Sequence, residues 1–294
     1  MPLFYRRLPR FEYVSPGTVD EAIAFISEHG EDAKLLAGGT DLVPQLKGRE
    51  VKARYVVDLK AMPGLDAVSS DGASVTIGAL ATINTIARSP LVNERLPLLV
   101  QAASVMASPQ VRNRGTFVGN ICSAVPSADS APGLLALEAR VRLKGPGGER
   151  IVAIDRFFTG SRTTVVARDE VALAIEVPFS PAVSRGVYLK LSPRHAMDLA
   201  VVGVAVHAVC DNGVCTRVRI GLGAVAPTPV RAPVAESLLE GRAITQELID
   251  EAARHSVTQC SPIDDHRASQ EYRCDMVYVM TRRALTQVLL EGGK

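Results

Sequence analysis

Apolar and polar residues recur with different periods along this chain, and the pattern changes near residue 180. Before that point, short apolar runs bounded by glycine and proline alternate with segments of helical spacing. The predicted strands cover residues 33–38, 53–59, 73–80 and 170–179, and the predicted helices cover residues 18–30, 82–96 and 97–106. We expect a break at Pro90, because proline interrupts a helix interior.

The segment 18–30, TVDEAIAFISEHG, carries a signal for each of its ends. Thr18 can cap the first turn, Glu21 follows three residues later as in a capping box, and Gly30 can end the helix. The sequence therefore predicts a compact helix at this position.

After residue 180 the valine-rich runs predict successive antiparallel strands, GVYLKLSPR (186–194) and LAVVGVAVHAVCDNGVCTRVRIGLGAV (199–225). The pair Asn212-Gly213 indicates a hairpin turn, so Cys210 and Cys215 should face each other as reduced thiols. Helices are predicted over residues 233–240, 245–258 and 271–292. In the last one, four apolar residues fall on one face at helical spacing: Val277, Met280, Ala284 and Val288.

Strands that are followed by helices, rather than alternating with them, are typical of α+β domains. We therefore predict an α+β protein with two parts. The first part is residues 1–177, in two lobes of roughly 1–58 and 59–177. The second part is a small α+β C-terminal domain, residues 178–294, with an antiparallel sheet plus helices.

The composition describes an ordinary globular protein and excludes some classes of function. Only 22% of the 294 residues are charged and the formal net charge is +2, which gives no electrostatic footprint for nucleic acid. No apolar run approaches the ~20 residues that span a bilayer, and the opening MPLFYRRLPRFEYV lacks the apolar core of a secretory signal. We expect a cytoplasmic protein, or one held peripherally by a partner.

Cysteine and histidine give no metal signal. The five cysteines are scattered and odd in number, which fits neither a disulfide framework nor a zinc or iron–sulfur pattern. The five histidines show no H-x-x-x-H spacing, so metal binding by this chain is not expected.

The stretch KLLAGGTDLVPQLKGR places Gly38 and Gly39 between a strand and a helix. Glycine permits a positive φ and close approach of the backbone, and the amides of such a turn form a concave donor set that suits phosphate oxygens. The hydroxyl of Thr40 can add one donor. The alternative is a plain strand–turn–helix junction.

A second glycine-punctuated stretch lies within residues 107–133, which we expect to be a long, ordered, functional loop because apolar residues are present in it. Here GTFVGN offers Thr116 and Asn120 as hydrogen-bonding groups, and Asp129 follows. Asp129 can cap the next helix or accept hydrogen bonds from a ribose. The chain lacks the G-x-G-x-x-G, P-loop and G-x-S-x-G motifs.

Four segments occur in a fixed order: LLAGGTDLVPQLKGR, SPQVRNRGTFVGNICSAVPSADSAPGLLALEARVRL, YLKLSPRHAMDLAVVGVAV and EYRCDMVYVMTRRAL. Together they resemble the FAD-binding medium subunit of the molybdenum hydroxylases, the xanthine dehydrogenase and carbon monoxide dehydrogenase family. The resemblance implies a two-lobed FAD-binding domain of the p-cresol methylhydroxylase type, followed by a small C-terminal domain.

The resemblance also implies the residues that contact FAD. One wall, along the pyrophosphate and toward the isoalloxazine, would be Ala37, Gly38, Gly39, Thr40, Asp41 and Leu42. The second wall would be Gly115, Thr116, Gly119 and Asn120. Asp129 would hold the ribose side, Lys190 would lie near the flavin or its phosphates, and Leu173 would pack on the ring system. The chain departs from the family in having Val118 where a glycine is usual, and Cys274 where an arginine is usual.

The function implied by the resemblance is electron transfer, with no catalytic side chain of this chain nominated. A molybdopterin-binding large subunit would oxidise the substrate, and a small subunit with two [2Fe–2S] clusters would deliver electrons to the FAD. The external acceptor would be NAD, oxygen or a quinone. The polar segment SPQVRNRG (108–115) is the candidate partner-facing region, or else an ordinary solvated loop.

Two other functions stay open at this point. One is a standalone flavin-dependent oxidoreductase of the same fold, which would need an acid/base pair in a substrate pocket. No cluster of His, Tyr or Glu in the first 178 residues nominates such a pair. The other is a flavin-free scaffold subunit, which Val118 favours.

Overall fold

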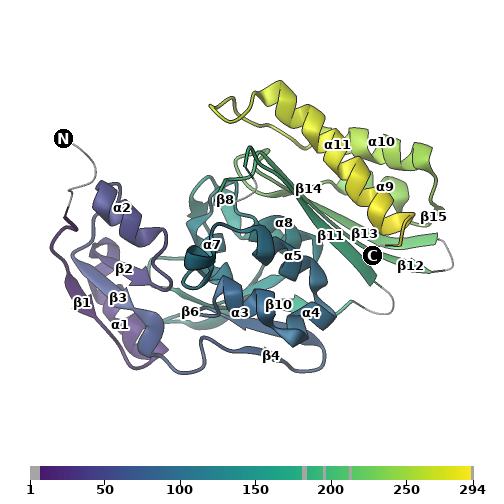
Figure 1. Cartoon of the computed structure of the whole chain (residues 1–294). Helices are drawn as coiled ribbons and strands as arrows, with labels where there is room; N and C mark the ends of the chain where they lie inside the picture. Colours follow the sequence, from purple (N-terminus) through teal and green to yellow (C-terminus); the bar gives the residue numbers. More distant parts are fainter. Residues whose placement is uncertain (1–6, 181–183, 195–196, 212–213, 293–294) are drawn as a thin grey trace.

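The computed structural model describes residues 7–180, 184–194, 197–211 and 214–292, in which the strands form three larger sheets and one two-stranded ribbon. Figure 1 shows the three sheets following one another along the molecule in sequence order. The first sheet has the order β1-β3-β2 and is parallel. Its elements are β1 (Glu12–Val14), α1 (Val19–His29), η2 (Gly30–Asp32), β2 (Ala33–Leu36), α2 (Leu42–Gly48), β3 (Tyr55–Asp58) and η3 (Leu59–Ala61).

The second sheet is antiparallel, in the order β4-β5-β10-β6-β7. Its strands are β4 (Val68–Ser70), β5 (Ser74–Gly78), β6 (Arg140–Gly145), β7 (Gly148–Ala153) and β10 (Val171–Pro178). The other elements of this part are α3 (Ile83–Arg88), α4 (Pro90–Arg95), α5 (Pro97–Val105), α6 (Pro109–Arg112), α7 (Phe117–Ser123), α8 (Ser130–Ala136) and η4 (Ile154–Arg156). The ribbon pairs β8 (Phe158–Gly160) with β9 (Thr163–Thr164).

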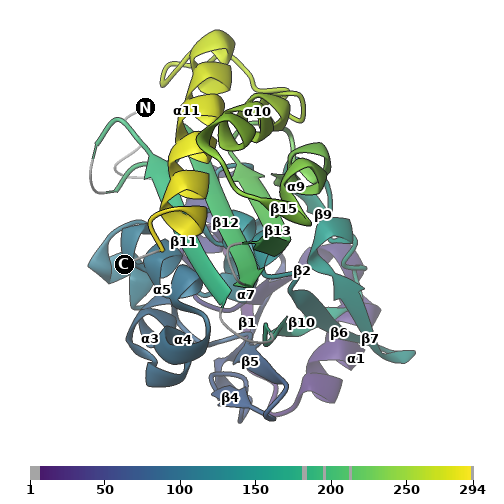
Figure 2. The same ribbon diagram turned by 90° about the vertical axis from the view of Figure 1, so that its right-hand side faces the viewer.

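The third sheet is antiparallel, in the order β11-β12-β13-β14, with β15 also paired to β13. Its strands are β11 (Ser184–Leu191), β12 (Val202–Asp211), β13 (Val214–Gly223), β14 (Val230–Arg231) and β15 (Arg242–Ala243). The helices α9 (Pro233–Leu239), α10 (Gln246–Val257) and α11 (Gln270–Leu289) lie together over one face of this sheet (Figure 2). Helices α5 and α8, which accompany the second sheet, contact the third sheet as well.

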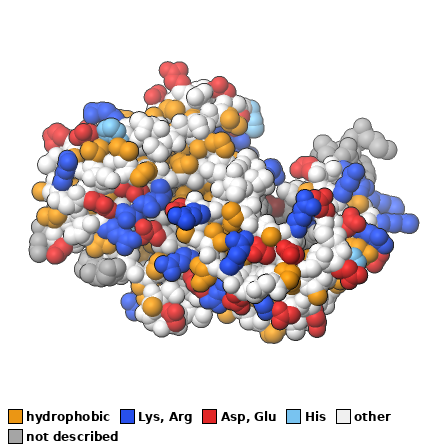
Figure 3. Space-filling model, turned by 180° about the vertical axis from the view of Figure 1, so that it is seen from behind, with side chains coloured by type: hydrophobic (Ala, Val, Ile, Leu, Met, Phe, Trp, Pro, Cys, Tyr) orange, Lys and Arg blue, Asp and Glu red, His pale blue; other side chains and the backbone are white. Residues whose placement is uncertain are grey.

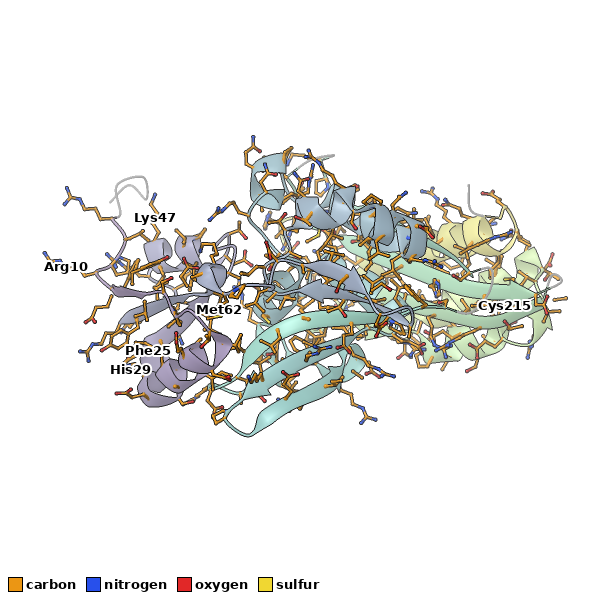
Figure 4. The ribbon with its side chains drawn as sticks, turned by 90° about the horizontal axis from the view of Figure 1, so that it is seen from below. Arg10, Phe25, His29, Lys47, Met62 and Cys215 are labelled. Atoms are coloured by element: carbon orange, nitrogen blue, oxygen red, sulfur yellow. The ribbon has the colours of Figure 1, made fainter. Side chains whose placement is uncertain are left out.

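Each sheet has its own apolar core, and two of these cores also include residues of a neighbouring sheet. The largest cluster lies around the second sheet and also contains Tyr188 and Ala205 of the third sheet. The N-terminal cluster contains Val171 of the second sheet, and beside it His29 stacks on Tyr55 with ring centroids 4.3 Å apart. Figure 4 shows Phe25 and His29 at the N-terminal end of the molecule and Cys215 at the other end. The division at residues 58/59 and 177/178 stays a prediction, and β10 runs across the second boundary to Pro178.

The local predictions for helix α1 and for the hairpin of the third sheet are confirmed. Thr18 Oγ1 accepts the amide hydrogen of Glu21 at 3.2 Å, and Gly30 ends the helix with φ 53°. Cys210 and Cys215 are register partners in the β12–β13 ladder, and both are free thiols. The predicted turn residues, 212–213, lie outside the described residues.

The expectation of a long loop over residues 107–133 is wrong. The segment contains α6 and α7 and the beginning of α8. These helices are only four to seven residues long, so they offer too few turns for a period of 3.6 residues to be visible in the sequence. Their N-caps, Ser108 and Thr116, each accept an amide hydrogen from the first turn.

A buried arginine fastens α11 to the third sheet. Arg273 is 2% exposed and donates to the carbonyl oxygens of Val201 (2.7 Å) and Ala224 (3.1 Å) and to Asp265 (2.9 Å). The planar guanidinium group donates to three acceptors at once, and the ammonium group of a lysine could not reach all three in this geometry. The EYRC segment therefore has a structural role at the start of α11.

We expect His207, on β12, to give the chain a stability that depends on acid. Burial, and then the positive charge of Arg219, lowers the pKa of His207 to about 4. The histidine of the unfolded chain binds a proton near pH 6.5, whereas His207 in the folded chain does so only near pH 4. The free energy of unfolding should therefore be highest above pH 6.5 and fall by about 3 kcal/mol as the pH drops toward 4. Urea unfolding between pH 4 and 8 measures the loss. His207→Gln should remove this part of the pH dependence, and an unchanged slope in that variant would contradict the assignment.

No helix in the described part of the chain is long and apolar enough to cross a membrane. On the face shown in Figure 3, lysine and arginine side chains lie beside acidic ones. This mixture agrees with the balanced charge of the sequence.

Candidate functional site

The two glycine-rich segments meet in the structure. We call residues 37–42 loop 1 and residues 115–120 loop 2. A Cβ atom added to Gly38 would lie 2.0 Å from the carbonyl oxygen of Arg114, and one added to Gly115 would lie 3.3 Å from Thr40 Oγ1. Ser123 at the end of α7 also donates to Asp41 Oδ2 at 2.6 Å. Loop 1 therefore packs directly on loop 2, and Gly38 is required for that contact.

A cavity of about 820 Å³ lies between the two loops, and we call it the two-loop cavity. Its volume is within the range of small-molecule and cofactor sites, roughly 300–1,000 Å³. The predicted site residues that line it are Ala37, Gly38, Gly39, Thr40, Asp41, Leu42, Gly115, Thr116, Gly119, Asn120 and Asp129. Leu173 and Lys190 are not among the lining residues.

Loop 1 presents backbone donors at the cavity. In the described part of the chain, the amides of Gly38, Gly39, Thr40 and Asp41 have no hydrogen-bond acceptor within the protein. Gly39 has φ 74°, in the left-handed region that favours glycine. Successive amides at such a turn suit the oxygens of a phosphate group. The donor set of this wall therefore fits a phosphate-bearing ligand such as FAD.

Loop 2 is held in shape by its own polar side chains. Thr116 caps α7 by accepting the Gly119 amide hydrogen at 2.9 Å, and it is 4% exposed. Asn120 Oδ1 accepts a hydrogen bond from Ser130 Oγ at 2.6 Å. Val118 is 3% exposed and belongs to the core cluster of the second sheet. The cavity stays open beside it, so valine at this position does not fill the space.

Asp129 takes the N-cap position of α8, but the capping interpretation is wrong because its side chain makes no capping hydrogen bond. It accepts instead from Tyr188 Oη at 2.7 Å and from Lys190 Nζ at 2.8 Å. Burial raises the pKa of Asp129, and the charge and hydrogen bond of Lys190 oppose the rise. Lys190 Nζ also donates to the carbonyl of Val105 at 3.3 Å. Asp129 therefore lies between Lys190 and the cavity.

Leu173 packs with the N-terminal apolar cluster and is not among the residues that line the cavity. Its neighbours Val171 and Ala172 line the cavity instead. A register shift in the β10–β6 ladder occurs between Ala172 and Ala174, which changes the alternation of side chains along β10. A flavin contact of Leu173 stays a prediction.

Sequence reasoning missed several residues that line the cavity, among them Arg162, Cys122, Ser123 and Met197. Arg162 and Met197 have φ 60° and 58°, and the lining residue Ala107 has φ 42°. Left-handed backbone at residues other than glycine tends to cluster at functional sites. Arg162 lies in the short turn between β8 and β9. No motif in the sequence marks it.

Comparison with known proteins agrees with this geometry. The family model described as "FAD binding domain in molybdopterin dehydrogenase" matches residues 9–180, and "CO dehydrogenase flavoprotein C-terminal domain" matches residues 187–288. The carbon monoxide dehydrogenase medium chain of Hydrogenophaga pseudoflava is 39% identical, over 94% of this chain and 96% of its own length. The xanthine dehydrogenase FAD-binding subunit of Escherichia coli O157:H7 is 32% identical, over 96% and 97%.

A solved structure of carbon monoxide dehydrogenase from H. pseudoflava is similar throughout. It superposes with a TM-score of 0.93 at 40% identity, covering 95% of this chain and 97% of the other. The resemblance carried by the four sequence segments and the α+β fold are thus confirmed. The chain belongs to the family of FAD-binding medium subunits of the molybdenum hydroxylases, it is an oxidoreductase subunit, and its cofactor is FAD.

Proposed function

We propose that this chain is the electron-transfer subunit of a cytoplasmic molybdenum hydroxylase complex. Electrons from the [2Fe–2S] clusters of a small subunit would reach the FAD held in the two-loop cavity. They would then leave for an external acceptor, NAD, oxygen or a quinone. A molybdopterin-binding large subunit would oxidise the organic substrate. When bound, the flavin supplies the redox chemistry, and this chain binds and orients it.

The observation that carries this proposal is the exposed rim of the two-loop cavity. Met197 is 66% exposed and Leu199 is 50% exposed, and both line the cavity. A relay needs its redox group close to a surface where another protein can approach. The related proteins are described as medium chains or subunits, which supports a role inside an assembly.

The standalone oxidoreductase is less well supported by the cavity. Among the described lining residues there is no His, Tyr or Lys to act as an acid/base pair with a carboxylate. Three of the four described lining carboxylates, those of Asp41, Asp129 and Asp198, are bonded to Ser123, Lys190 and Arg194 respectively. The flavin-free scaffold is disfavoured by the open cavity beside Val118.

The test uses the full chain purified with whatever chains accompany it. We expect a yellow protein that co-purifies with a molybdopterin-bearing chain and an iron–sulfur chain. Mixing the dithionite-reduced iron–sulfur chain with the FAD-loaded chain should bleach the flavin absorbance without any organic donor. Turnover of an organic donor by the isolated chain would favour the standalone enzyme. Absence of flavin even after FAD is added would favour the scaffold.

A charge reversal in SPQVRNRG separates docking from cofactor binding. Arg114 is exposed at the end of this segment, beside loop 2. If the segment faces the partner, Arg114→Glu should slow flavin reduction by the iron–sulfur chain about tenfold while the FAD content stays unchanged. Arg168→Glu is the matched control, since Arg168 is exposed and pairs with Glu31 outside the cavity. Equal rates for the two variants would assign docking to another surface.

A further inference from the structure

We propose that Arg162, rather than Lys190, supplies the positive charge that meets the phosphates of FAD. This inference goes beyond the electron route proposed above and does not depend on it, because it concerns only the binding of the cofactor. The reference is the affinity of the wild-type chain for FAD.

The cavity needs a cation. FAD brings a doubly negative pyrophosphate, and the lining already contains the carboxylates of Asp41, Glu50, Asp129 and Asp198. The amides of loop 1 offer dipoles but no net charge. Among the described residues that line the cavity, Arg162 is the one lysine or arginine. Without it, none of the described lining residues would bring a positive charge to the phosphates.

Lys190 is already committed to other groups. Its side chain is only 7% exposed, and its ammonium group is bonded to Asp129 and to the carbonyl of Val105. Turning it toward a phosphate would leave the 9% exposed carboxylate of Asp129 without its counter-ion, which is costly in a buried site. Lys60, beside loop 1, is likewise paired with Asp58 at 2.6 Å.

Arg162 is available and held in place. Its backbone amide donates to the carbonyl of Ala124 at 2.8 Å, which ties the β8–β9 turn to the end of α7. The preceding residue of that helix end, Ser123, is bonded to Asp41 of loop 1, so the turn adjoins both walls of the cavity. In the described part of the chain the guanidinium of Arg162 has no carboxylate partner.

The chemistry of a guanidinium suits this role. Arginine offers a rigid fork of donors that pairs bidentately with phosphate, and it stays charged at every accessible pH. The left-handed backbone of Arg162 is an unfavourable conformation for a residue with a side chain. Its presence at the cavity, where glycine would relieve the strain, is consistent with a binding role for the side chain.

The experiment measures flavin affinity with three ligands that differ in phosphate. FAD-depleted wild-type and Arg162→Gln chains are titrated with FAD, FMN and riboflavin by flavin fluorescence, at about 50 and 500 mM salt. We expect Arg162→Gln to weaken FAD binding about tenfold to hundredfold, FMN less or equally, and riboflavin less than twofold. The salt dependence of FAD binding should shrink in this variant, since a screened charge pair has been removed.

Two further variants distinguish a charge effect from a change in packing. Arg162→Lys keeps the charge and should recover part of the FAD affinity and the salt dependence. Arg168→Gln removes an exposed arginine outside the cavity and should leave all three affinities unchanged. The FAD-to-protein ratio of each chain as purified provides a second readout.

The proposal is overturned if Arg162→Gln binds FAD within twofold of wild type with the same salt dependence. It is also overturned if riboflavin loses as much affinity as FAD, which would indicate a general change of cavity shape. A loss of salt dependence in Lys190→Met with none in Arg162→Gln would return the role to Lys190.

Discussion

Replacing Gly38 with alanine should leave the chain essentially without FAD. The new Cβ would lie 2.0 Å from the carbonyl oxygen of Arg114 and 2.7 Å from its carbonyl carbon. Both atoms belong to the backbone, so the clash cannot be relieved by rotating a side chain. Loop 1 must move away from loop 2, which separates the two walls of the cavity. We expect the FAD dissociation constant to rise about hundredfold or more, the equivalent of ~3 kcal/mol.

The same substitution should lower the free energy of unfolding by roughly 1–3 kcal/mol, the usual range for overpacking. Gly147→Ala is the matched control, because a Cβ at that position has no neighbour within 4 Å and no positive φ is involved. Fluorescence titration with FAD and urea unfolding of both variants measure the two effects. If Gly38→Ala keeps wild-type FAD affinity, the direct contact between the loops is not needed for binding.

Replacing Lys190 with methionine should be the most destabilising single change at the cavity. The pair Lys190–Asp129 has side chains that are 7% and 9% exposed, so removing the ammonium leaves a buried carboxylate with only the hydroxyl of Tyr188. Breaking a buried pair in this way typically costs about 3–5 kcal/mol. Lys144→Met is the matched control, because its partner Asp20 is 76% exposed, and such surface pairs contribute only about 0–1 kcal/mol.

The pH dependence of Lys190→Met follows from the sign of the pKa change. Burial already raises the pKa of Asp129, and loss of Lys190 should raise it further. A carboxyl group whose folded-state pKa lies above its unfolded value lowers the free energy of unfolding as pH rises from the unfolded pKa, and this loss is complete above the folded pKa. The loss of stability in Lys190→Met should therefore be larger at pH 8 than at pH 5. Urea unfolding across this range measures it, and a loss independent of pH would indicate packing alone.

Local signals explain why some elements were predictable from sequence. Helix α1 has a capping side chain at Thr18 and a terminating glycine at Gly30, and both act within a few residues. The face shared by Val277, Met280, Ala284 and Val288 follows from helical spacing, and all four are buried. The order of strands in the second sheet could not be read, because β10 inserts between β5 and β6 through contacts distant in sequence.

The same distinction holds for the site. Loops 1 and 2 could be predicted, because closely spaced glycines are visible in the sequence itself. Tyr188 and Lys190 are two residues apart on β11 and so lie on one face of the strand, but only the fold shows that both reach Asp129. Arg162 reaches the cavity because its turn adjoins α7, and that proximity has no sequence signature.

The close approach of α8 to the third sheet ties the cofactor site to the C-terminal half of the molecule. A Cβ atom at Gly221 would lie 2.2 Å from the carbonyl oxygen of Pro132, so β13 and α8 meet backbone to backbone. Helix α8, which begins directly after Asp129, thus packs on strand β13, about ninety residues later in the sequence. A fragment ending near residue 180 would lack both that contact and Lys190, the counter-ion of Asp129, so we expect it to bind flavin less tightly than the whole chain.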